Sequence, residues 1–201
     1  MEKPAQTRVP IADIIARRWS GRAFDRDKPV GREQLVALLE AARWAPSCRG
    51  EQPWRYIVWD RFVDEAAWSR AFECLSEGNR PWVSNAPILL LATAYRFFEH
   101  NGSPNRWAQY DTGAASENLC LQAVALGLMA HQMGGFDAEK VRAAFQIPDE
   151  FECMAMIAIG YPAEPEVLES PYRERELAER VRRPLGELFF DGVWQKPIDA
   201  P

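Results

Sequence analysis

Apolar side chains recur at the spacing of an amphipathic helix in several stretches of the chain. In the helix predicted at residues 32–44 they share one face, which contains Leu35, Leu38, Leu39 and Ala42. Pro46 then ends this helix, because proline lacks the backbone donor that the next turn needs. Further helices are predicted at residues 11–18 and 62–76, and from the cap residue Asp137 to residue 145.

Short apolar runs predict buried strands between these helices. They lie at residues 54–59, 87–95 and 154–160. The segments at residues 78–85 and 97–105 contain glycine, proline and asparagine and are predicted as loops. Strands and helices do not alternate as regular β–α–β units, so we predict an α+β fold in one domain over residues 1–201.

A long helix rich in small and apolar residues begins near Trp107 and is predicted to end at Gly127. Its small side chains would let other backbones approach closely, as in a buried central helix. After a short apolar run at residues 128–133 come Gly134 and Gly135. This pair is either an ordinary bend or a site where backbone N–H groups bind a flat ligand or an anion.

Composition is that of a globular protein with no membrane or nucleic-acid partner. The chain has 201 residues, of which 47% are hydrophobic and 26% charged. No apolar run approaches the roughly 20 residues that span a bilayer, and the first ten residues lack the apolar core of a signal peptide. We therefore expect a cytoplasmic protein. The net charge of −5 argues against nucleic acid as a partner.

Cysteine and histidine form no metal-binding pattern. The chain has two histidines and four widely spaced cysteines, which are Cys48, Cys74, Cys120 and Cys153. This spacing disfavours a structural zinc site and a disulfide scaffold. Cys48 lies beside Arg49, which could stabilise a thiolate, but no base lies nearby in the sequence to make it a catalytic nucleophile.

Positive charge is concentrated at residues 17–28 and 173–183 of this acidic chain. The two clusters are either solvated faces or one phosphate site built from both ends of the chain. In the first cluster, Arg18 and Arg22 flank Ser20 within the segment RWSGRAF. Guanidinium groups bind phosphate through paired hydrogen bonds, and a serine hydroxyl adds another.

The segment APSCRGEQPW at residues 45–54 joins a predicted helix to a predicted strand. Ser47, Gln52 and the backbone near Pro46 could bind a polar heterocycle; alternatively, the segment is a turn with a packed Trp54. The chain contains no nucleophile elbow, Walker loop, dinucleotide-binding glycine motif or His-Glu-x-x-His. If the protein is an enzyme, a cofactor therefore supplies its chemistry.

Five segments together resemble the FMN-dependent nitroreductases. They follow the family's order and cover nearly the whole chain: RWSGRAF, EAARWAPSCRGEQPWRYIV, LGLMAHQMGGFD, IAIGYP and RRPLGELFF. The resemblance implies an α+β fold with a mixed sheet flanked by helices. It also implies an intertwined homodimer, in which a C-terminal extension at about residues 184–201 reaches the partner subunit and two FMN sites lie at the interface.

The resemblance also implies which residues bind FMN. They come from four segments: Arg18, Trp19, Ser20 and Arg22; Pro46, Ser47, Cys48 and Gln52; Met133, Gly134 and Gly135; and Arg182 and Arg183. The first segment would hold the phosphate, ribityl chain and pyrimidine edge, with the main chain at residue 19 taking part. Residues 46–48 would come from the other subunit, and the pair at 182–183 would reach the phosphate. Gly134 would donate its backbone N–H to flavin N5.

The implied activity is hydride transfer from NAD(P)H through flavin N5 to a nitroaromatic, a quinone or a similar electron-poor acceptor, by a ping-pong mechanism. We expect His131, Phe98 and Trp107 to line the acceptor space. Gly50 stands where the family usually has asparagine, so a side-chain contact to the flavin is missing or is replaced by Glu51, Gln52 or water. The alternatives are a specialised FMN enzyme for reductive dehalogenation or ring oxidation, and a non-catalytic flavin-binding protein.

Overall fold

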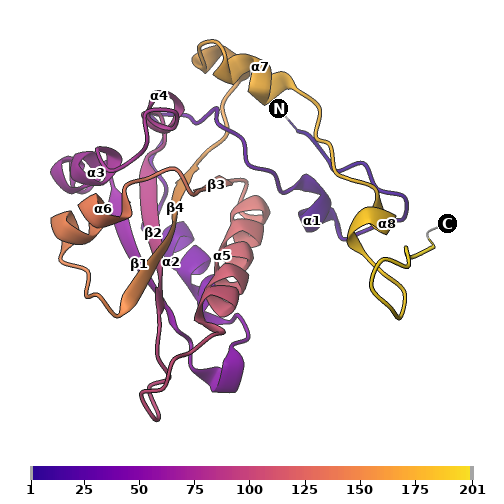
Figure 1. Cartoon of the computed structure of the whole chain (residues 1–201). Helices are drawn as coiled ribbons and strands as arrows, with labels where there is room; N and C mark the ends of the chain where they lie inside the picture. Colours follow the sequence, from indigo (N-terminus) through magenta and orange to yellow (C-terminus); the bar gives the residue numbers. More distant parts are fainter. Residues whose placement is uncertain (1, 200–201) are drawn as a thin grey trace.

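The computed structural model describes residues 2–199, and positions 1, 200 and 201 of the predicted domain lie outside it. Its centre is a four-stranded sheet in the order β1–β2–β4–β3 (Figure 1). The strands are β1 (Trp54–Asp60), β2 (Ile88–Tyr95), β3 (Met129–Met133) and β4 (Phe151–Gly160). The predicted α+β class is confirmed. Every strand pair within residues 2–199 is antiparallel, so this part of the chain shows no mixed sheet.

Helices cover both faces of the sheet (Figure 1). On one face lie α2 (Arg32–Arg43) and α5 (Ala108–Ala125), whose core contacts include Leu38, Leu90, Leu119 and Ile157. On the other face lie α3 (Glu65–Phe72) and α6 (Ala138–Phe145), whose core includes Trp68, Leu91, Val141 and Met156. The sheet is therefore buried between two apolar layers, which explains why β2 is an almost unbroken apolar run.

Positions 127 and 135 require glycine for different structural reasons. Gly127, at the end of α5, has a φ of +70°, as the sequence predicted for a helix stop. Gly135 needs space instead. A Cβ at this position would lie 2.7 Å from both Asn79 Nδ2 and Ser76 Oγ. The carbonyl oxygen of Gly135 accepts hydrogen bonds from the Ser76 N–H and from Asn79 Nδ2, so this turn is tied to the segment after α3.

Three predicted boundaries are wrong. The helix expected at residues 62–76 is the shorter α3, because the Asp64 side chain accepts from the Ala67 N–H and starts the helix there. The loop expected at residues 78–85 contains α4 (Arg80–Val83), since Pro81 suits a first helical turn. The strand expected at residues 154–160 begins three residues earlier, at Phe151, where it pairs with Tyr95.

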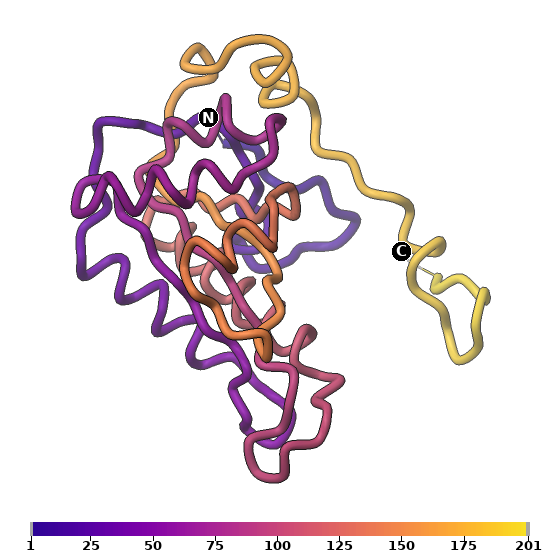
Figure 2. The backbone as a smooth tube through the Cα atoms, turned by 60° about the vertical axis from the view of Figure 1, so that its left-hand side comes forward, coloured from indigo at the N-terminus to yellow at the C-terminus, as the bar shows by residue number. Residues whose placement is uncertain are grey.

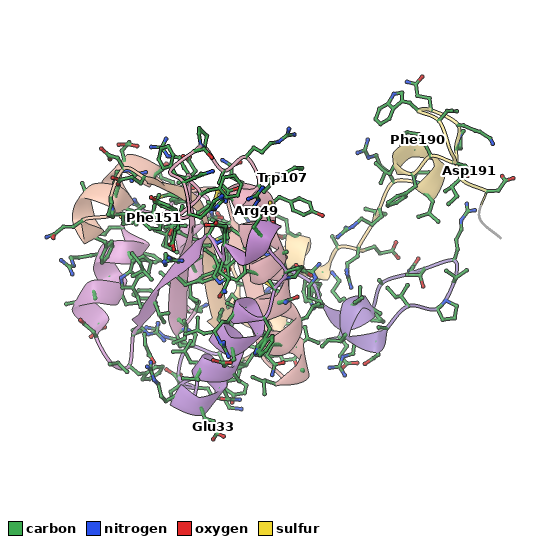
Figure 3. The ribbon with its side chains drawn as sticks, turned by 90° about the horizontal axis from the view of Figure 1, so that it is seen from below. Glu33, Arg49, Trp107, Phe151, Phe190 and Asp191 are labelled. Carbon is green, nitrogen blue, oxygen red and sulfur yellow. The ribbon has the colours of Figure 1, made fainter. Side chains whose placement is uncertain are left out.

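The remaining elements connect and extend this body. They are α1 (Asp13–Arg17), η1 (Cys48–Gly50), η2 (Pro165–Val167), α7 (Tyr172–Leu177) and α8 (Leu185–Leu188). After α7, residues 178–199 form what we call the C-terminal arm, which leaves the body and carries α8 (Figures 1 and 2). In Figure 3, Phe190 and Asp191 of the arm lie well away from Phe151 of the sheet.

None of the helices within residues 2–199 combines the length and the apolar character that crossing a membrane requires. The cytoplasmic location stays a prediction.

Candidate functional site

The segment after α1, residues 18–23, is called here the arginine loop. Arg18 Nε lies 3.2 Å from Glu117 Oε1 of α5, and Arg18 also donates to Ser20 Oγ at 3.5 Å. Burial raises the pKa of Glu117, and the charge of Arg18 partly opposes this rise. The Arg22 guanidinium lies 5.8 Å from the ring centroid of Trp82. The structure thus brings Arg18, Ser20 and Arg22 into one partly buried basic site.

Side chains from other elements bind the backbone of the arginine loop. Glu176 of α7 is only 2% exposed, and its carboxylate accepts from the Arg22 N–H at 2.9 Å and from the Ala23 N–H at 3.2 Å. His131 of β3 lies with Nδ1 2.9 Å from the Gly21 carbonyl oxygen. Burial lowers the pKa of His131 to about 4, so at neutral pH the uncharged ring donates through Nδ1.

The second basic cluster meets the first one in space. Arg180 donates to the carbonyl oxygens of Ala16 and Arg18, each at 2.9 Å. Arg182 and Arg183 follow two and three residues later on the exposed arm. They line a cleft of about 460 Å³ between residues 5–11 and the start of the arm. The sequence clusters at 17–28 and 173–183 therefore contribute to one region of positive charge.

The end of β3, three residues after the His131 contact with the arginine loop, presents open backbone. Gly134 is exposed and, apart from its chain neighbours, no heavy atom of residues 2–199 lies within 4 Å of a Cβ placed there. Met133 is only 4% exposed and packs in the core, so only its main chain can line a site. The Trp19 side chain is half-buried and lies under the Lys3 ammonium at 4.9 Å. The main chain at Gly134 is therefore not covered by other side chains of the described residues.

The loop between α2 and β1 is a second group of predicted site residues. Ser47 Oγ accepts from the Gln52 N–H at 3.0 Å, and the Cys48 N–H donates to Asp111 Oδ2 at 2.9 Å. Asp111 comes from α5 and is 5% exposed. Pro46 is exposed beside this loop. A buried carboxylate thus fixes the backbone at Cys48.

The family departure at Gly50 preserves a backbone requirement. Gly50 has a φ of +71°, a left-handed conformation that glycine adopts without strain and that asparagine tolerates better than most residues. Its neighbour Glu51 is directed elsewhere, because its carboxylate lies 2.5 Å from His100 Nδ1 and accepts from the Glu99 N–H at 2.8 Å. These contacts lower the pKa of Glu51. The Glu51 carboxylate therefore already has hydrogen-bond partners within this chain, which leaves Gln52 or water to replace the missing asparagine contact to the flavin.

The predicted acceptor-lining residues divide between the two groups. Phe98 is half-buried, with its ring centroid 5.3 Å from that of His100, which in turn lies 3.4 Å from Arg49. Trp107 is 43% exposed at the start of α5, and Figure 3 shows it at the same end of the body as Arg49. His131 belongs instead to the arginine-loop group, where its ring packs on Trp82 with centroids 4.4 Å apart.

Within one chain these two groups stay apart. The arginine loop contacts β3, and the second loop leads into β1; β1 and β3 are the two outer strands of the described sheet. Trp54, at the start of β1, pairs with Ala94, whereas Met129 of β3 pairs with Gly160 at the opposite end of the ladder. Within one chain, the two groups of predicted site residues therefore do not form one closed site.

Four residues that contact the two groups of predicted site residues were not predicted from the sequence. These are Trp82, Asp111, Glu176 and Arg180. Arg180 and Glu176 lie in the basic cluster at 173–183, but their partners are more than 150 positions away along the chain. Asp111 lies in the first turn of α5, one of two acidic residues in a helix rich in small residues, and this was a usable signal.

Solved structures define the class of this fold. An oxidoreductase containing FMN has a TM-score of 0.87 with this chain and is 35% identical, over 95% of this chain and 96% of that one. A Desulfovibrio desulfuricans protein solved in complex with FMN has a TM-score of 0.70 and is 26% identical, over 90% and 95% of the two chains. The fold is thus that of an oxidoreductase class with FMN-bound members.

Sequence comparison gives the family. The model described as the nitroreductase family matches residues 15–161. An NADH dehydrogenase of Thermus thermophilus is 31% identical over 190 residues, covering 78% of this chain and 90% of that protein. The chain belongs to the nitroreductase family, and the family and the oxidoreductase class predicted from its motifs are confirmed.

Proposed function

We propose that this protein binds FMN and uses NAD(P)H to reduce a flat, electron-poor acceptor such as a nitroaromatic or a quinone. The observation that carries the proposal is the open backbone at Gly134, three residues after His131, whose side chain contacts the arginine loop. The names of the Thermus relative and of the FMN-containing structure support it. Bound FMN would supply the ring that accepts a hydride from NAD(P)H and passes it to the acceptor.

The residues present fit the cofactor. Arg18 and Arg22 offer guanidinium groups and Ser20 a hydroxyl, which is the donor set for a phosphate and a ribityl chain. Arg182 and Arg183 add exposed charge from the arm. A site that ends in a cluster of arginines suits the terminal phosphate of FMN, and we infer FMN rather than FAD.

At the reactive end, the chain would contribute backbone groups rather than acids or bases. The Gly134 N–H is the donor that we assign to flavin N5, with the main chain of Met133 and Gly135 beside it. Such a donor favours the reduced ring, because it stabilises negative charge at that edge. Glycine at position 134 leaves room for a planar ring to approach the main chain.

We also infer a homodimer with the FMN sites at its interface. Two half-sites on opposite edges of the sheet become complete when a second copy brings its loop at residues 46–48 to the arginine loop. The C-terminal arm exposes large apolar side chains, among them Val181 at 78%, Phe189 at 54% and Trp194 at 80%. Apolar groups in such number indicate a surface that a partner covers.

The first test is the identity of the bound flavin. The purified protein is expected to be yellow and, after denaturation, to release FMN that chromatography separates from FAD. Flavin-free protein should bind added FMN in preference to FAD. Release of FAD, or failure to bind either flavin, contradicts the proposal.

Reoxidation of the reduced protein by nitroaromatics, quinones and halogenated phenols then identifies the acceptor class, and the absence of any turnover indicates a flavin carrier.

A further inference from the structure

One peptide bond of the arginine loop is held from both sides. The Gly21 carbonyl oxygen accepts from His131 Nδ1 at 2.9 Å. The Arg22 N–H of the same peptide donates to both carboxylate oxygens of Glu176, each at 2.9 Å. Because a peptide unit is planar, these contacts from β3 and α7 fix its orientation as well as its position.

The peptide is also tightly packed at Gly21. A Cβ on Gly21 would lie 2.2 Å from Met129 Sδ and 2.9 Å from Glu176 Oε1. The His131 ring rests on Trp82, which is 1% exposed. Movement of the peptide would therefore have to displace core side chains.

Glu176 is buried at a substantial free-energy cost, because a carboxylate loses its hydration there. Within residues 2–199, the hydrogen-bond donors to its carboxylate are backbone N–H groups of the arginine loop, at Arg22 and Ala23. The role of the buried charge is thus to hold this loop, since an apolar residue would pack α7 without that cost.

We propose that Glu176 and His131 are positioning residues, which lock the Gly21–Arg22 peptide and thereby direct the side chains of Ser20 and Arg22 toward the phosphate end of FMN. This inference rests on the proposed function, because it takes those side chains to bind the cofactor. Glu176 and His131 act through the backbone. The expected place of His131 beside the acceptor stays a separate prediction.

If Glu176 acted only through its charge, its removal would have the opposite effect on phosphate binding. Its carboxylate is a negative charge next to a site for an anion, and its field raises the pKa of Arg22 against the lowering effect of burial. Removing that charge should, by Coulomb's law, strengthen phosphate binding. Positioning predicts weaker binding, so the sign of the effect separates the two accounts.

The variant Glu176→Gln removes the charge and turns an amide N–H toward the loop donors. We expect its FMN dissociation constant to rise about tenfold or more, as for the loss of hydrogen bonds to a charged group. Glu174→Gln, on the exposed side of α7, is the matched control for charge and should change binding less than about twofold. An equal or lower dissociation constant for Glu176→Gln overturns the proposal.

A second pair of variants tests His131 without changing the carboxylate. His131→Phe keeps a ring against Trp82 but removes the donor to Gly21, whereas the side-chain amide of His131→Asn can replace Nδ1. We expect weaker FMN binding in the phenylalanine variant and substantial recovery in the asparagine variant. If both variants bind FMN equally, the hydrogen bond to Gly21 does not position the loop.

Hydrogen exchange in the flavin-free protein provides a readout that needs no cofactor. The amides of Arg22 and Ala23 should exchange faster in Glu176→Gln than in Glu174→Gln, while amides of β2 stay protected in both. If the parent protein binds no FMN, the proposed function fails, yet this comparison still tests the lock. If the parent binds FMN and exchange at Arg22 is unchanged, the lock is wrong and the function stands.

Discussion

His131 shows at the scale of one residue how the site determines ionisation. Its pKa falls to about 4 because burial disfavours the imidazolium and because Arg22 and Arg18 repel it; the hydrogen bond to Gly21 acts in the other direction. The ordinary value is 6.5. Between these two pH values, the unfolded chain binds a proton that the folded chain does not.

His131 should therefore not lower the free energy of unfolding above about pH 6.5. As the pH falls from 6.5 toward 4, the free energy of unfolding should decrease, because the unfolded chain takes up the proton that the folded chain excludes. We expect the full loss to be about 3 kcal/mol, since each unit of pKa shift corresponds to about 1.4 kcal/mol. Urea unfolding of flavin-free protein at several pH values measures it, with His131→Asn as the reference that cannot titrate. A difference between parent and variant that is the same at pH 4 and pH 7 contradicts the assigned pKa shift.

Variants of Gly134 can separate an effect on the stability of the fold from an effect on turnover. An added Cβ meets open space, so Gly134→Ala should change the free energy of unfolding by less than about 0.5 kcal/mol. With FMN bound, the methyl group crowds the ring, and turnover should fall moderately. Gly134→Pro removes the backbone donor, so turnover should nearly vanish and the flavin midpoint potential should decrease. An unchanged potential in a folded, FMN-loaded proline variant would place Gly134 away from N5.

At the scale of elements, local signals determined most of the fold. The face formed by Leu35 and Leu38 predicted α2, and the apolar run before Tyr95 predicted β2. Local signals failed at α4, whose glycine, asparagine and proline surroundings are typical of a loop, and whose Trp82 becomes a core residue through distant contacts.

The same limit applies to the site. The motif residues Arg18, Ser20 and Arg22 could be singled out because they lie close together in the sequence, and their role in binding FMN stays a prediction. Glu176 could not, because nothing in its charged surroundings distinguishes a buried carboxylate from a solvated one. Its burial follows from contacts with residues 22 and 23 that only the folded chain creates.

The end of α5 offers a test of element-level reasoning. Gly127 has a φ of +70°, so Gly127→Ala should lower the free energy of unfolding by about 1 kcal/mol. Gly78 is exposed and has no positive φ, and its alanine variant should be near neutral. Chemical denaturation of the two variants side by side provides the comparison. Equal stability for both would show that the left-handed conformation does not determine the need for glycine at position 127.

At the scale of the whole molecule, the proposed homodimer would account both for the exposed C-terminal arm and for the separation of the two groups of predicted site residues. Sedimentation at micromolar concentration should therefore give about twice the chain mass of 22.9 kDa. Removal of residues 184–201 should abolish both the dimer and FMN binding.

Trp194→Asp should weaken the dimer, whereas Val63→Asp, at an equally exposed apolar position of the body, should not. A truncated monomer that retains FMN contradicts the two-chain site.

The most direct test of the account is the reduction and reoxidation of the bound flavin in two separate steps without oxygen. NADH or NADPH should bleach the visible absorption of the FMN-loaded protein. After removal of the nicotinamide, a nitroaromatic or quinone should restore that absorption in a second, independent step. This result is predicted by an FMN oxidoreductase that exchanges two substrates at one site. Flavin that stays oxidised with both nicotinamides, in protein shown to hold FMN, would contradict it.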